Sequence, residues 1–222
     1  MEFGDVVRRR RMVRAYDPDR TVNPAVLETV LEAARRTPSA GFSQGVALLV
    51  LTADADRAAF WRLGVAGAPG AGGPPDRWLA GMSSAPVLVL VWTSEAAYRA
   101  RYAEPDKRPA SARDGRAPGQ LPWSVPYWWV DAGMSVQALL YAAVDAGLGA
   151  AFAGVPEAAV GPVAGHFGVP HDRALVGVVT LGHPATSPGA AGSAARRGRR
   201  PRSEVIHHAH WSDECSGGKG PV

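Results

Sequence analysis

The sequence has a single cysteine, no long apolar run, and no excess of positive charge outside two short segments. Cys215 has no second cysteine to pair with, so an intramolecular disulfide and a cysteine metal cluster are both excluded, and redox chemistry would require a cofactor. The longest apolar stretch outside the alanine-rich parts is Ala85 to Trp92, far shorter than the roughly 20 residues that cross a bilayer. We therefore expect no membrane span.

The length and composition predict one globular domain. The chain has 222 residues, of which 46% are hydrophobic, enough to bury a full core. We expect a single domain over residues 1–211, including an extended Pro/Gly/Arg-rich segment at 187–203, and a disordered tail at 212–222. The residues that follow Arg8 to Arg11 are charged rather than apolar, so we expect no signal peptide and a cytoplasmic protein.

The positive charge is concentrated in two short runs near opposite ends of the chain. Removing their ten arginines from the 24 Lys and Arg leaves 14, against 20 Asp and Glu. Guanidinium groups bind phosphate oxygens in pairs, so the two runs would form a phosphate site if the fold brought them together. From the runs alone, two solvated basic ends are an equal alternative. The runs consist of Arg8, Arg9, Arg10, Arg11 and Arg14, and of Arg196, Arg197, Arg199, Arg200 and Arg202.

Apolar periodicity and turn residues predict a mixture of helices and strands. Asn23 followed by Pro24 is typical of a helix start, and the helix over residues 127–146 is apolar nearly all round, which predicts burial in a core or a subunit interface. Residues 104–126 are rich in Pro, Gly and charge and suggest a lid. The predicted helices cover residues 3–14, 24–37, 54–63, 127–146 and 156–167, and the predicted strands cover residues 46–52, 86–93, 150–153 and 175–181.

Several separated stretches, in the same order, resemble the flavin-dependent nitroreductase family. They are Arg10-Arg11-Met12-Val13-Arg14-Ala15-Tyr16, then Thr37-Pro38-Ser39-Ala40-Gly41-Phe42-Ser43-Gln44, then Asp131 to Ala143 with Gly147-Leu148-Gly149 and Phe152-Ala153-Gly154, and finally Leu181 to Ala185 before Arg199-Arg200-Pro201. Each motif alone is weak, but separated matches with compatible spacing make chance an unsatisfactory explanation.

The resemblance implies a fold, a cofactor and an activity. The implied fold is α+β and nitroreductase-like, with a central, mostly antiparallel sheet flanked by helices, in an intertwined homodimer whose C-terminal tail reaches the partner. The implied cofactor is FMN, and the donor is NADPH or NADH. The implied activity is hydride or electron transfer through FMN to a small organic acceptor, such as a nitroaromatic or a quinone, by a ping-pong mechanism. No partnership with nucleic acid or membrane is implied.

The resemblance also implies which residues form the site, whereas no catalytic side chain and no metal ligand is predicted. The first helix would contact the FMN phosphate and ribityl chain, small loop residues and a later strand would flank the ring, and arginines from the tail would close the phosphate. The implied cofactor residues are Arg10, Arg11, Met12, Arg14, Pro38, Ser39, Ala40, Gly41, Phe152, Ala153, Gly154, Arg197, Arg199 and Arg200. The candidate acceptor walls are Phe42, Trp123, Tyr127 and Trp128, for which ordinary core packing is the competing interpretation.

Three departures from the family pattern affect substrate choice more than cofactor binding. Met12 stands where Ser or Thr is usual, so only its backbone can contribute a polar contact. Phe42 stands where Asn is common, and Gly45 replaces the usual Pro.

Two other functions fit parts of the sequence. One keeps the fold and FMN but makes the protein a biosynthetic dehydrogenase or oxidase of a small molecule that does not use NAD(P)H. The other is a nucleic-acid-binding protein that uses the arginine runs on phosphates, although no recognition helix or stacking sheet accompanies them. Residues 207–215 contain three histidines, Asp213 and Cys215, but no second cluster completes a metal site.

Overall fold

The computed structural model describes residues 1–65, 76–107, 120–121, 123–187 and 196–211. The chain divides into two compact units, Met1–Ala190 and Ala191–Val222. The first contains the sheet and nearly all the helices, and each unit is described by itself.

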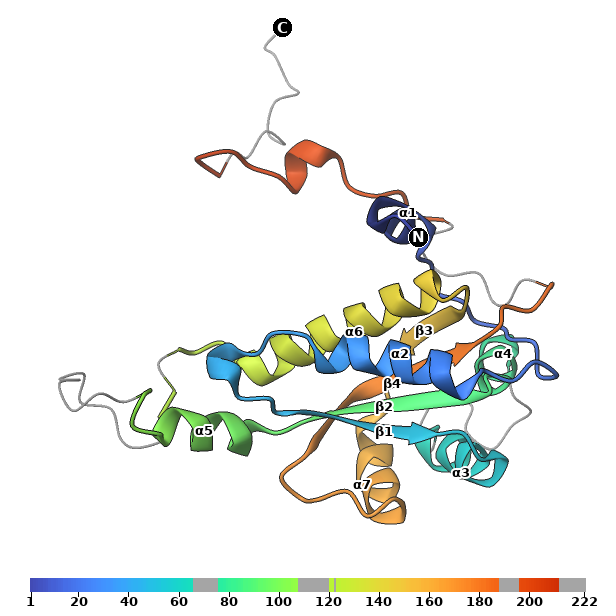
Figure 1. The fold of residues 1–222 in the computed structure, drawn as a ribbon, viewed down its shortest axis with the longest axis horizontal. Coiled ribbons are helices and arrows are strands. Elements are labelled where there is room, and N and C mark those ends of the chain that lie inside the picture. Colours follow the sequence, from blue (N-terminus) through green and yellow to red (C-terminus); the bar gives the residue numbers. More distant parts are fainter. Residues whose placement is uncertain (66–75, 108–119, 122, 188–195, 212–222) are drawn as a thin grey trace, which may run out of the picture. The chain divides into compact units, whose positions relative to one another are not determined.

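The first unit is built on a four-stranded sheet in which every neighbouring pair is antiparallel (Figure 1). The order across the sheet is β1-β2-β4-β3. β2 is buried along its whole length, as expected of an inner strand rich in valine and leucine, whereas the edge strand β1 is mostly half-buried. The strands are β1 (Val46–Leu51), β2 (Val87–Thr93), β3 (Gly149–Ala153) and β4 (Ala174–Gly182). The predicted antiparallel sheet flanked by helices is thus confirmed.

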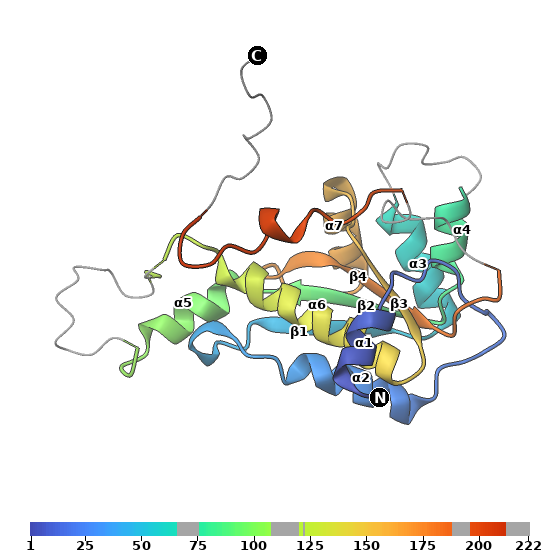
Figure 2. The same cartoon turned by 90° about the horizontal axis from the view of Figure 1, so that it is seen from above.

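Helices cover both faces of this sheet (Figures 1 and 2). On one face, α2 (Pro24–Arg35) and α6 (Tyr127–Asp145) bury Leu27, Val30, Leu139 and their neighbours against the strands. On the other face, α3 (Asp54–Gly64) and α7 (Glu157–His166) cover Leu88 and Leu90. The Asn23 side chain accepts the Ala25 N–H at 2.8 Å, which confirms the predicted start of α2.

The first helix is shorter than the sequence predicts, and this changes how the first arginine run is presented. α1 ends at Arg9, and Arg10 has the extended dihedral angles φ −58° and ψ 120°. The expected helix over residues 3–14 is therefore wrong in its second half, because Met12 instead pairs with the sheet at Ala150. Local pattern cannot show such a tertiary pairing.

Two helices and one short turn were not predicted from the sequence. α4 (Arg77–Ser83) and α5 (Glu95–Ala103) each begin with a capping side chain, Asp76 and Ser94 respectively, that accepts a backbone N–H of the first turn. A 3₁₀ turn, η1 (Ala40–Phe42), follows α2. The predicted lid at 104–126 lies largely outside the described residues.

The second unit contributes the 3₁₀ turn η3 (Arg202–Glu204) and otherwise irregular chain between residues 196 and 211. Much of the predicted extended segment at 187–203, and the predicted disordered tail at 212–222, lie outside the described residues. Among the described helices, none combines the length and apolar character needed to cross a membrane.

Candidate active site

The segment that carries the first arginines runs along the outer edge of β3. Met12 forms a parallel bridge with Ala150, and the Val13 N–H donates to the Ala150 carbonyl at 2.9 Å. Further along, Tyr16 forms an antiparallel bridge with Pro184. The segment is therefore held as an additional short piece of sheet.

Tyr16 anchors the end of this segment in the core. Its side chain is 2% exposed, and its hydroxyl lies 2.6 Å from Thr180 Oγ1 and 2.7 Å from the Val13 carbonyl. Burial raises the pKa of Tyr16 well above its usual value, so the phenol remains protonated and can donate. The Tyr16 N–H donates to Ser84 Oγ at 3.0 Å, which fixes the segment against the end of α4.

A glycine allows the segment to pass close to α4. A Cβ atom at Gly81 would lie 2.1 Å from the Arg14 carbonyl oxygen, a separation that no side chain could accept. Since the obstructing atom belongs to the backbone, rotation of a side chain could not relieve the contact. Gly81 thus determines where Arg14 can lie.

The arginines on this fixed segment have no acidic partner among the described residues. Arg11 is exposed, and Arg10 and Arg14 are half-buried. Among the described residues, the Arg14 guanidinium makes one long hydrogen bond, 3.4 Å, to the Met12 carbonyl. Arg8, by contrast, pairs with Asp5 on α1. The positive charge of Arg10, Arg11 and Arg14 is therefore available for an external anion.

β3 joins these arginines to a second group of predicted cofactor residues. Because Met12 lies beside Ala150, the arginine segment lies next to the strand whose far end carries Phe152 and Ala153. Ala153 and Gly154 also line a cavity of about 180 Å³ with the rings of Phe60, Trp61 and Trp78. The structure thus brings together two of the predicted groups, residues 10–14 and 152–154.

The loop that carries Pro38, Ser39, Ala40 and Gly41 has an unusual backbone. Gly41, Phe42 and Gln44 have φ angles of 64°, 58° and 50°, in the left-handed region. That region is ordinary for glycine but rare for a bulky residue such as Phe42, whose side chain is 70% exposed. Left-handed conformation at non-glycine residues persists only where neighbouring contacts enforce it, and such positions cluster at ligand sites.

Two buried polar residues of α6 hold this loop. Ser135 Oγ lies 2.7 Å from Thr37 Oγ1, and Asp131 Oδ2 accepts the Ala40 N–H at 2.7 Å. The same oxygen of Asp131 accepts the Tyr98 hydroxyl of α5 at 2.6 Å. Burial, and then the contact with Asp131, raise the pKa of Tyr98 above its usual value. Because the Ala40 N–H is used within the protein, it does not point toward a ligand.

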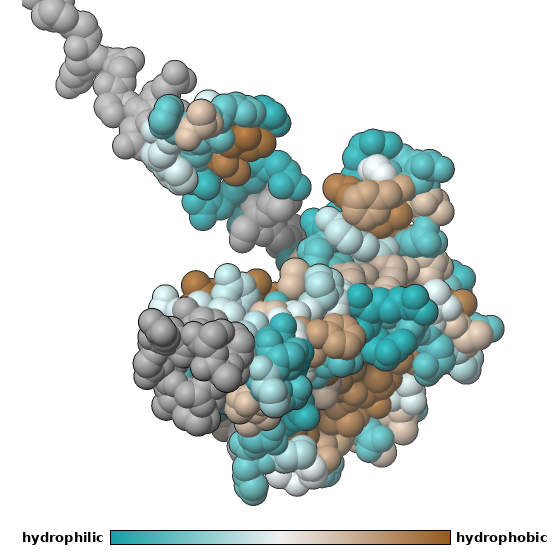
Figure 3. Space-filling view, turned by 60° about the vertical axis from the view of Figure 1, so that its left-hand side comes forward, coloured by the Kyte–Doolittle hydropathy of each residue, from teal (hydrophilic) through white to brown (hydrophobic). Residues whose placement is uncertain are grey.

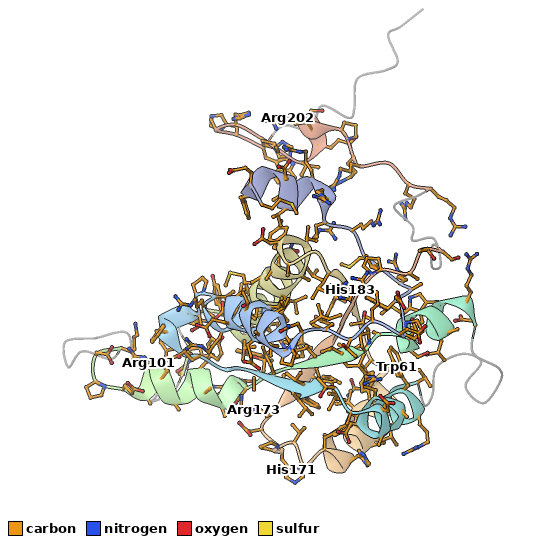
Figure 4. The ribbon with its side chains drawn as sticks, turned by 45° about the vertical axis from the view of Figure 1, so that its right-hand side comes forward. Trp61, Arg101, His171, Arg173, His183 and Arg202 are labelled. Carbon is orange, nitrogen blue, oxygen red and sulfur yellow. The ribbon has the colours of Figure 1, made fainter. Side chains whose placement is uncertain are left out.

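Arg101 on α5 supports the loop from its other side (Figure 4). Its Nε donates to the Gly41 carbonyl at 2.9 Å, while its terminal nitrogens bind Glu104 and Asp106. Arg101 lowers the pKa of Asp106 and raises its own through this contact. A Cβ at Gly41 would lie 2.6 Å from the Tyr102 ring, so the loop packs directly on α5.

A cavity of about 590 Å³ opens beside the loop, between α2, α6 and the edge strand β1. Pro38, Ser39 and Gln44 lie at one end, and Val46, Leu48 and Val50 form an apolar wall. On the face that Figure 3 shows, brown apolar surface reaches solvent between hydrophilic areas. Because Glu28, Glu32 and Arg35 also line it, the cavity can accept a group that has both an apolar and a polar part.

The loop contacts the start of α6, and the arginine segment follows α1, which contacts the other end of that helix. The loop binds Asp131 and Ser135 near the start of the helix, whereas the Met1 ammonium binds Asp145 at its end, and the arginine segment pairs with β3 just beyond. With a rise of 1.5 Å per residue, the 14 residues from Asp131 to Asp145 span about 21 Å. Among the described residues, no hydrogen bond or ion pair joins the loop to the arginine segment.

The predicted acceptor walls lie at the loop's end of the molecule. Trp123 packs edge-on against both Tyr102 and Tyr127, with ring centroids 4.6 and 4.9 Å apart. Trp128 lies 6.3 Å from the Tyr98 ring, and Thr93 Oγ1 donates to its carbonyl at 2.9 Å. These contacts show ordered packing, and the role of these residues toward an acceptor stays a prediction.

The predicted arginines of the tail belong to the second unit. Arg197, Arg199 and Arg200 are exposed there, and their approach to residues 10–14 stays a prediction. Within the described part of the chain, no three His, Cys, Asp or Glu side chains are grouped as metal ligands. Asp131, Tyr98 and Arg101 were not predicted as site residues. Two features of the sequence pointed to Asp131: it begins a stretch that resembles the family, and it is an isolated acid within the apolar sequence over 127–144.

Solved structures from several bacteria share this fold. A protein of Exiguobacterium sibiricum 255-15, named as a nitroreductase in complex with FMN, is 19% identical, with a TM-score of 0.68 over 94% of this chain and 97% of its own. One of Desulfovibrio desulfuricans, named in the same way, is 21% identical, with a TM-score of 0.66 over 96% and 99%. An FMN-dependent nitroreductase of Clostridium difficile R20291 is 15% identical, with a TM-score of 0.63 over 92% and 98%. At these identities the likeness establishes the fold alone.

The sequence itself carries the family assignment. No curated protein sequence matches this chain. The model of the Nitroreductase family matches residues 7–183, which include the arginine segment, the loop of η1, α6 and all four strands. The chain therefore belongs to the nitroreductase family.

Proposed function

We propose that this protein is an FMN-dependent oxidoreductase that passes reducing equivalents from NADH or NADPH to a small organic acceptor in a ping-pong reaction. Family membership supports the reaction class. The observation that carries the proposal is the fixed segment at β3, which presents Arg10, Arg11 and Arg14 without an acidic partner among the described residues. Such a group of guanidiniums suits the phosphate of a mononucleotide.

The residues beside the arginines also suit the rest of the cofactor. Ala153 and Gly154 have little or no side chain, so a flat ring could approach the backbone closely, and Phe152 offers apolar cover. Met12 contributes its backbone. Arg199, with Arg197 or Arg200, would close the phosphate from the tail. Bound FMN supplies the hydride chemistry, and the protein residues bind it, orient it and exclude water.

We propose further that the site is shared between the two subunits of a homodimer. The separation of the loop and the arginine segment along α6 supports this, because Pro38, Ser39, Ala40 and Gly41 of a second subunit could complete a site that one chain leaves open. The exposed apolar side chains of α1 and α6 offer a matching interface. They are Phe3, Val7, Trp129, Val130 and Met134. In such a dimer, residues 205–211 of the tail would pack on the partner.

The acceptor would then lie against the aromatic side chains near the loop. Phe42 is exposed in the loop, Trp123 precedes α6, and Tyr127 and Trp128 lie in the first turn of α6. No acid or base is required from the protein for the donor half-reaction. We expect these residues to select acceptors by shape and stacking.

Anaerobic reduction of the purified protein tests the cofactor and the donor together. A flavin absorbance spectrum that bleaches within seconds of adding NADH or NADPH is the expected result, followed by reoxidation by a quinone or nitroaromatic. A flavin spectrum that neither nicotinamide bleaches would instead favour a biosynthetic dehydrogenase. A colourless protein that does not take up FMN would contradict the proposal.

Mixed dimers test the shared site. One variant carries Arg10→Gln with Arg14→Gln, and the other carries Gly41→Val, which places a side chain on a left-handed residue and against Tyr102. Each variant alone should bind FMN weakly. Co-expressed with separate affinity tags and purified as a heterodimer, they should regain one intact site per dimer. If each site came from one chain, the heterodimer would regain none.

A further inference from the structure

The loop beside the cavity is held by a buried negative charge. Asp131 is 2% exposed and Tyr98 is fully buried, yet the carboxylate binds only neutral donors among the described residues, the Ala40 N–H and the Tyr98 hydroxyl. A buried carboxylate is costly unless its hydrogen bonds compensate the lost hydration. A buried carboxylate on a largely apolar helix, with two neutral donors and no cation among the described partners, requires an explanation.

The hydrogen bond from Ala40 lies beside the left-handed part of the loop. Ala40 immediately precedes Gly41 and Phe42, both left-handed, and Gln44 is left-handed as well. Inside the loop, the Gln44 N–H donates to Ser39 Oγ at 3.0 Å and Ser43 Oγ donates to the Ala40 carbonyl at 2.6 Å. These bonds close the loop on itself, whereas the bond to Asp131 attaches it to the core.

We propose that Asp131 is a positioning residue: it holds the loop of residues 39–44 in its strained conformation, and its negative charge lowers the reduction potential of FMN bound against that loop. The electrostatic part rests on the proposed function. A fixed negative charge in a poorly hydrated environment opposes the extra electron density of the reduced ring, so it favours the oxidised form.

Tyr98 moderates this charge. Its hydroxyl donates to the same oxygen that accepts the Ala40 N–H, so part of the carboxylate's charge is offset by the phenol dipole. Replacement of Asp131 and replacement of Tyr98 should therefore shift the potential in opposite directions. A purely structural role of the pair would not produce opposite signs.

Hydrogen exchange in the protein without FMN tests the positioning. In Asp131→Ala, the Ala40 amide loses its acceptor, and its exchange should become about tenfold faster or more, since a hydrogen bond to a charged group protects strongly. In Asp131→Asn, an amide oxygen can still accept, so the exchange should change less. Unchanged exchange in Asp131→Ala would overturn the positioning role.

Redox titration of the FMN-loaded protein tests the charge. Asp131→Asn should strengthen the binding of reduced FMN relative to oxidised FMN by about tenfold, which raises the midpoint potential by about 30 mV for a two-electron couple. Tyr98→Phe should lower the potential. The matched control is Asp54→Asn on α3, which removes the same charge from a side chain that is 96% exposed and should leave the potential unchanged.

The outcomes separate this inference from the function on which it rests. A wild-type protein that binds no FMN would overturn the proposed function and the electrostatic role, while the exchange measurement would still decide the positioning. FMN binding with the same potential in wild type and Asp131→Asn would overturn the electrostatic role alone. If Asp131→Asn fails to fold, the Tyr98→Phe variant decides the question. A midpoint potential in Tyr98→Phe that rises or stays the same would also overturn the electrostatic role of Asp131.

Discussion

The arginine segment and the loop of η1 lie at opposite ends of α6 and are fixed in different ways. The arginine segment is held by backbone bridges to β3 and by close packing on Gly81, and its guanidiniums have no carboxylate partner among the described residues. The loop is held by side chains, Asp131 and Ser135 from α6 and Arg101 from α5. In one region the charges face outward, and in the other they are used internally.

This difference indicates that the two regions could bind different parts of a ligand. A segment fixed by its backbone can offer all its charged side chains to an anion. A loop whose polar groups are already satisfied can offer mainly shape and apolar contact, as the exposed Phe42 suggests. The proposed shared site would combine one region of each kind from the two subunits.

The largest effect is expected on FMN affinity, from the arginines that have no acidic partner among the described residues. Replacing both Arg10 and Arg14 by glutamine should weaken FMN binding about a hundredfold or more, because each hydrogen bond to a charged group contributes about 1.5–3 kcal/mol. Fluorescence titration with FMN measures this effect. Arg8→Gln removes the same charge from a residue that is paired with Asp5 and should change the affinity little. An equal loss of FMN affinity in Arg8→Gln and in the double variant would show that affinity depends on the net charge of the segment and not on the positions of the arginines.

The next effect concerns the backbone packing of the arginine segment. Gly81→Ala places a Cβ 2.1 Å from the Arg14 carbonyl oxygen, and overpacking against backbone should lower the free energy of unfolding by about 2 kcal/mol. The matched control is Gly165→Ala on α7, where an added Cβ would meet nothing within 4 Å outside its own turn and the higher helix propensity of alanine should raise stability by up to about 1 kcal/mol. Urea denaturation of both variants checks the opposite signs, and a stabilised Gly81→Ala would contradict the packing described here.

The sequence allowed much of the fold to be predicted and only part of the site. The strands over 46–52, 86–93, 150–153 and 175–181 are confirmed within a residue or two, because buried strands carry continuous apolar runs. The extension of the first helix to Arg14 was wrong, because pairing of Met12 with Ala150 depends on a partner far away in the sequence. α4 and α5 went unnoticed, since both are short and border Pro/Gly-rich segments.

In the candidate site, too, contacts between distant parts of the sequence could not be predicted. Motifs identified residues such as Arg10 and Ser39, because the family pattern specifies the residue types at those positions. They assigned no role to Asp131, Tyr98 or Arg101, because those roles depend on contacts between α5, α6 and the loop. Asp131 begins a stretch that resembles the family, but the stretch does not show that its carboxylate holds the loop.

A smaller effect is expected at the other attachment of the loop. Ser135→Ala removes the hydrogen bond to Thr37, whose hydroxyl still donates to the Ala34 carbonyl at 2.8 Å. One buried neutral hydrogen bond should account for about 1 kcal/mol of unfolding free energy. Ser83→Ala on α4, an exposed serine that bonds within its own helix, is the control and should change stability by less than about 0.5 kcal/mol. Equal effects would mean that Ser135 does not attach the loop.

The smallest effect is expected on the pH dependence of the unfolding free energy, which depends on two buried tyrosines. Tyr16 lies at the arginine segment and Tyr98 at the loop. Burial raises both pKa values in the folded protein above the ordinary value of about 10, so the unfolded chain releases these protons at lower pH than the folded one. Their contribution to stability is therefore fully present below about pH 10 and is lost as the pH rises, by about 0.4 kcal/mol per tyrosine at pH 10 itself. Tyr16→Phe and Tyr98→Phe should each flatten the decline in unfolding free energy between pH 8 and 10.5, although each lowers stability at neutral pH. If one of the two variants leaves this decline unchanged, the tyrosine replaced in that variant already ionises in the folded protein. Its surroundings are then more open to water than its burial indicates.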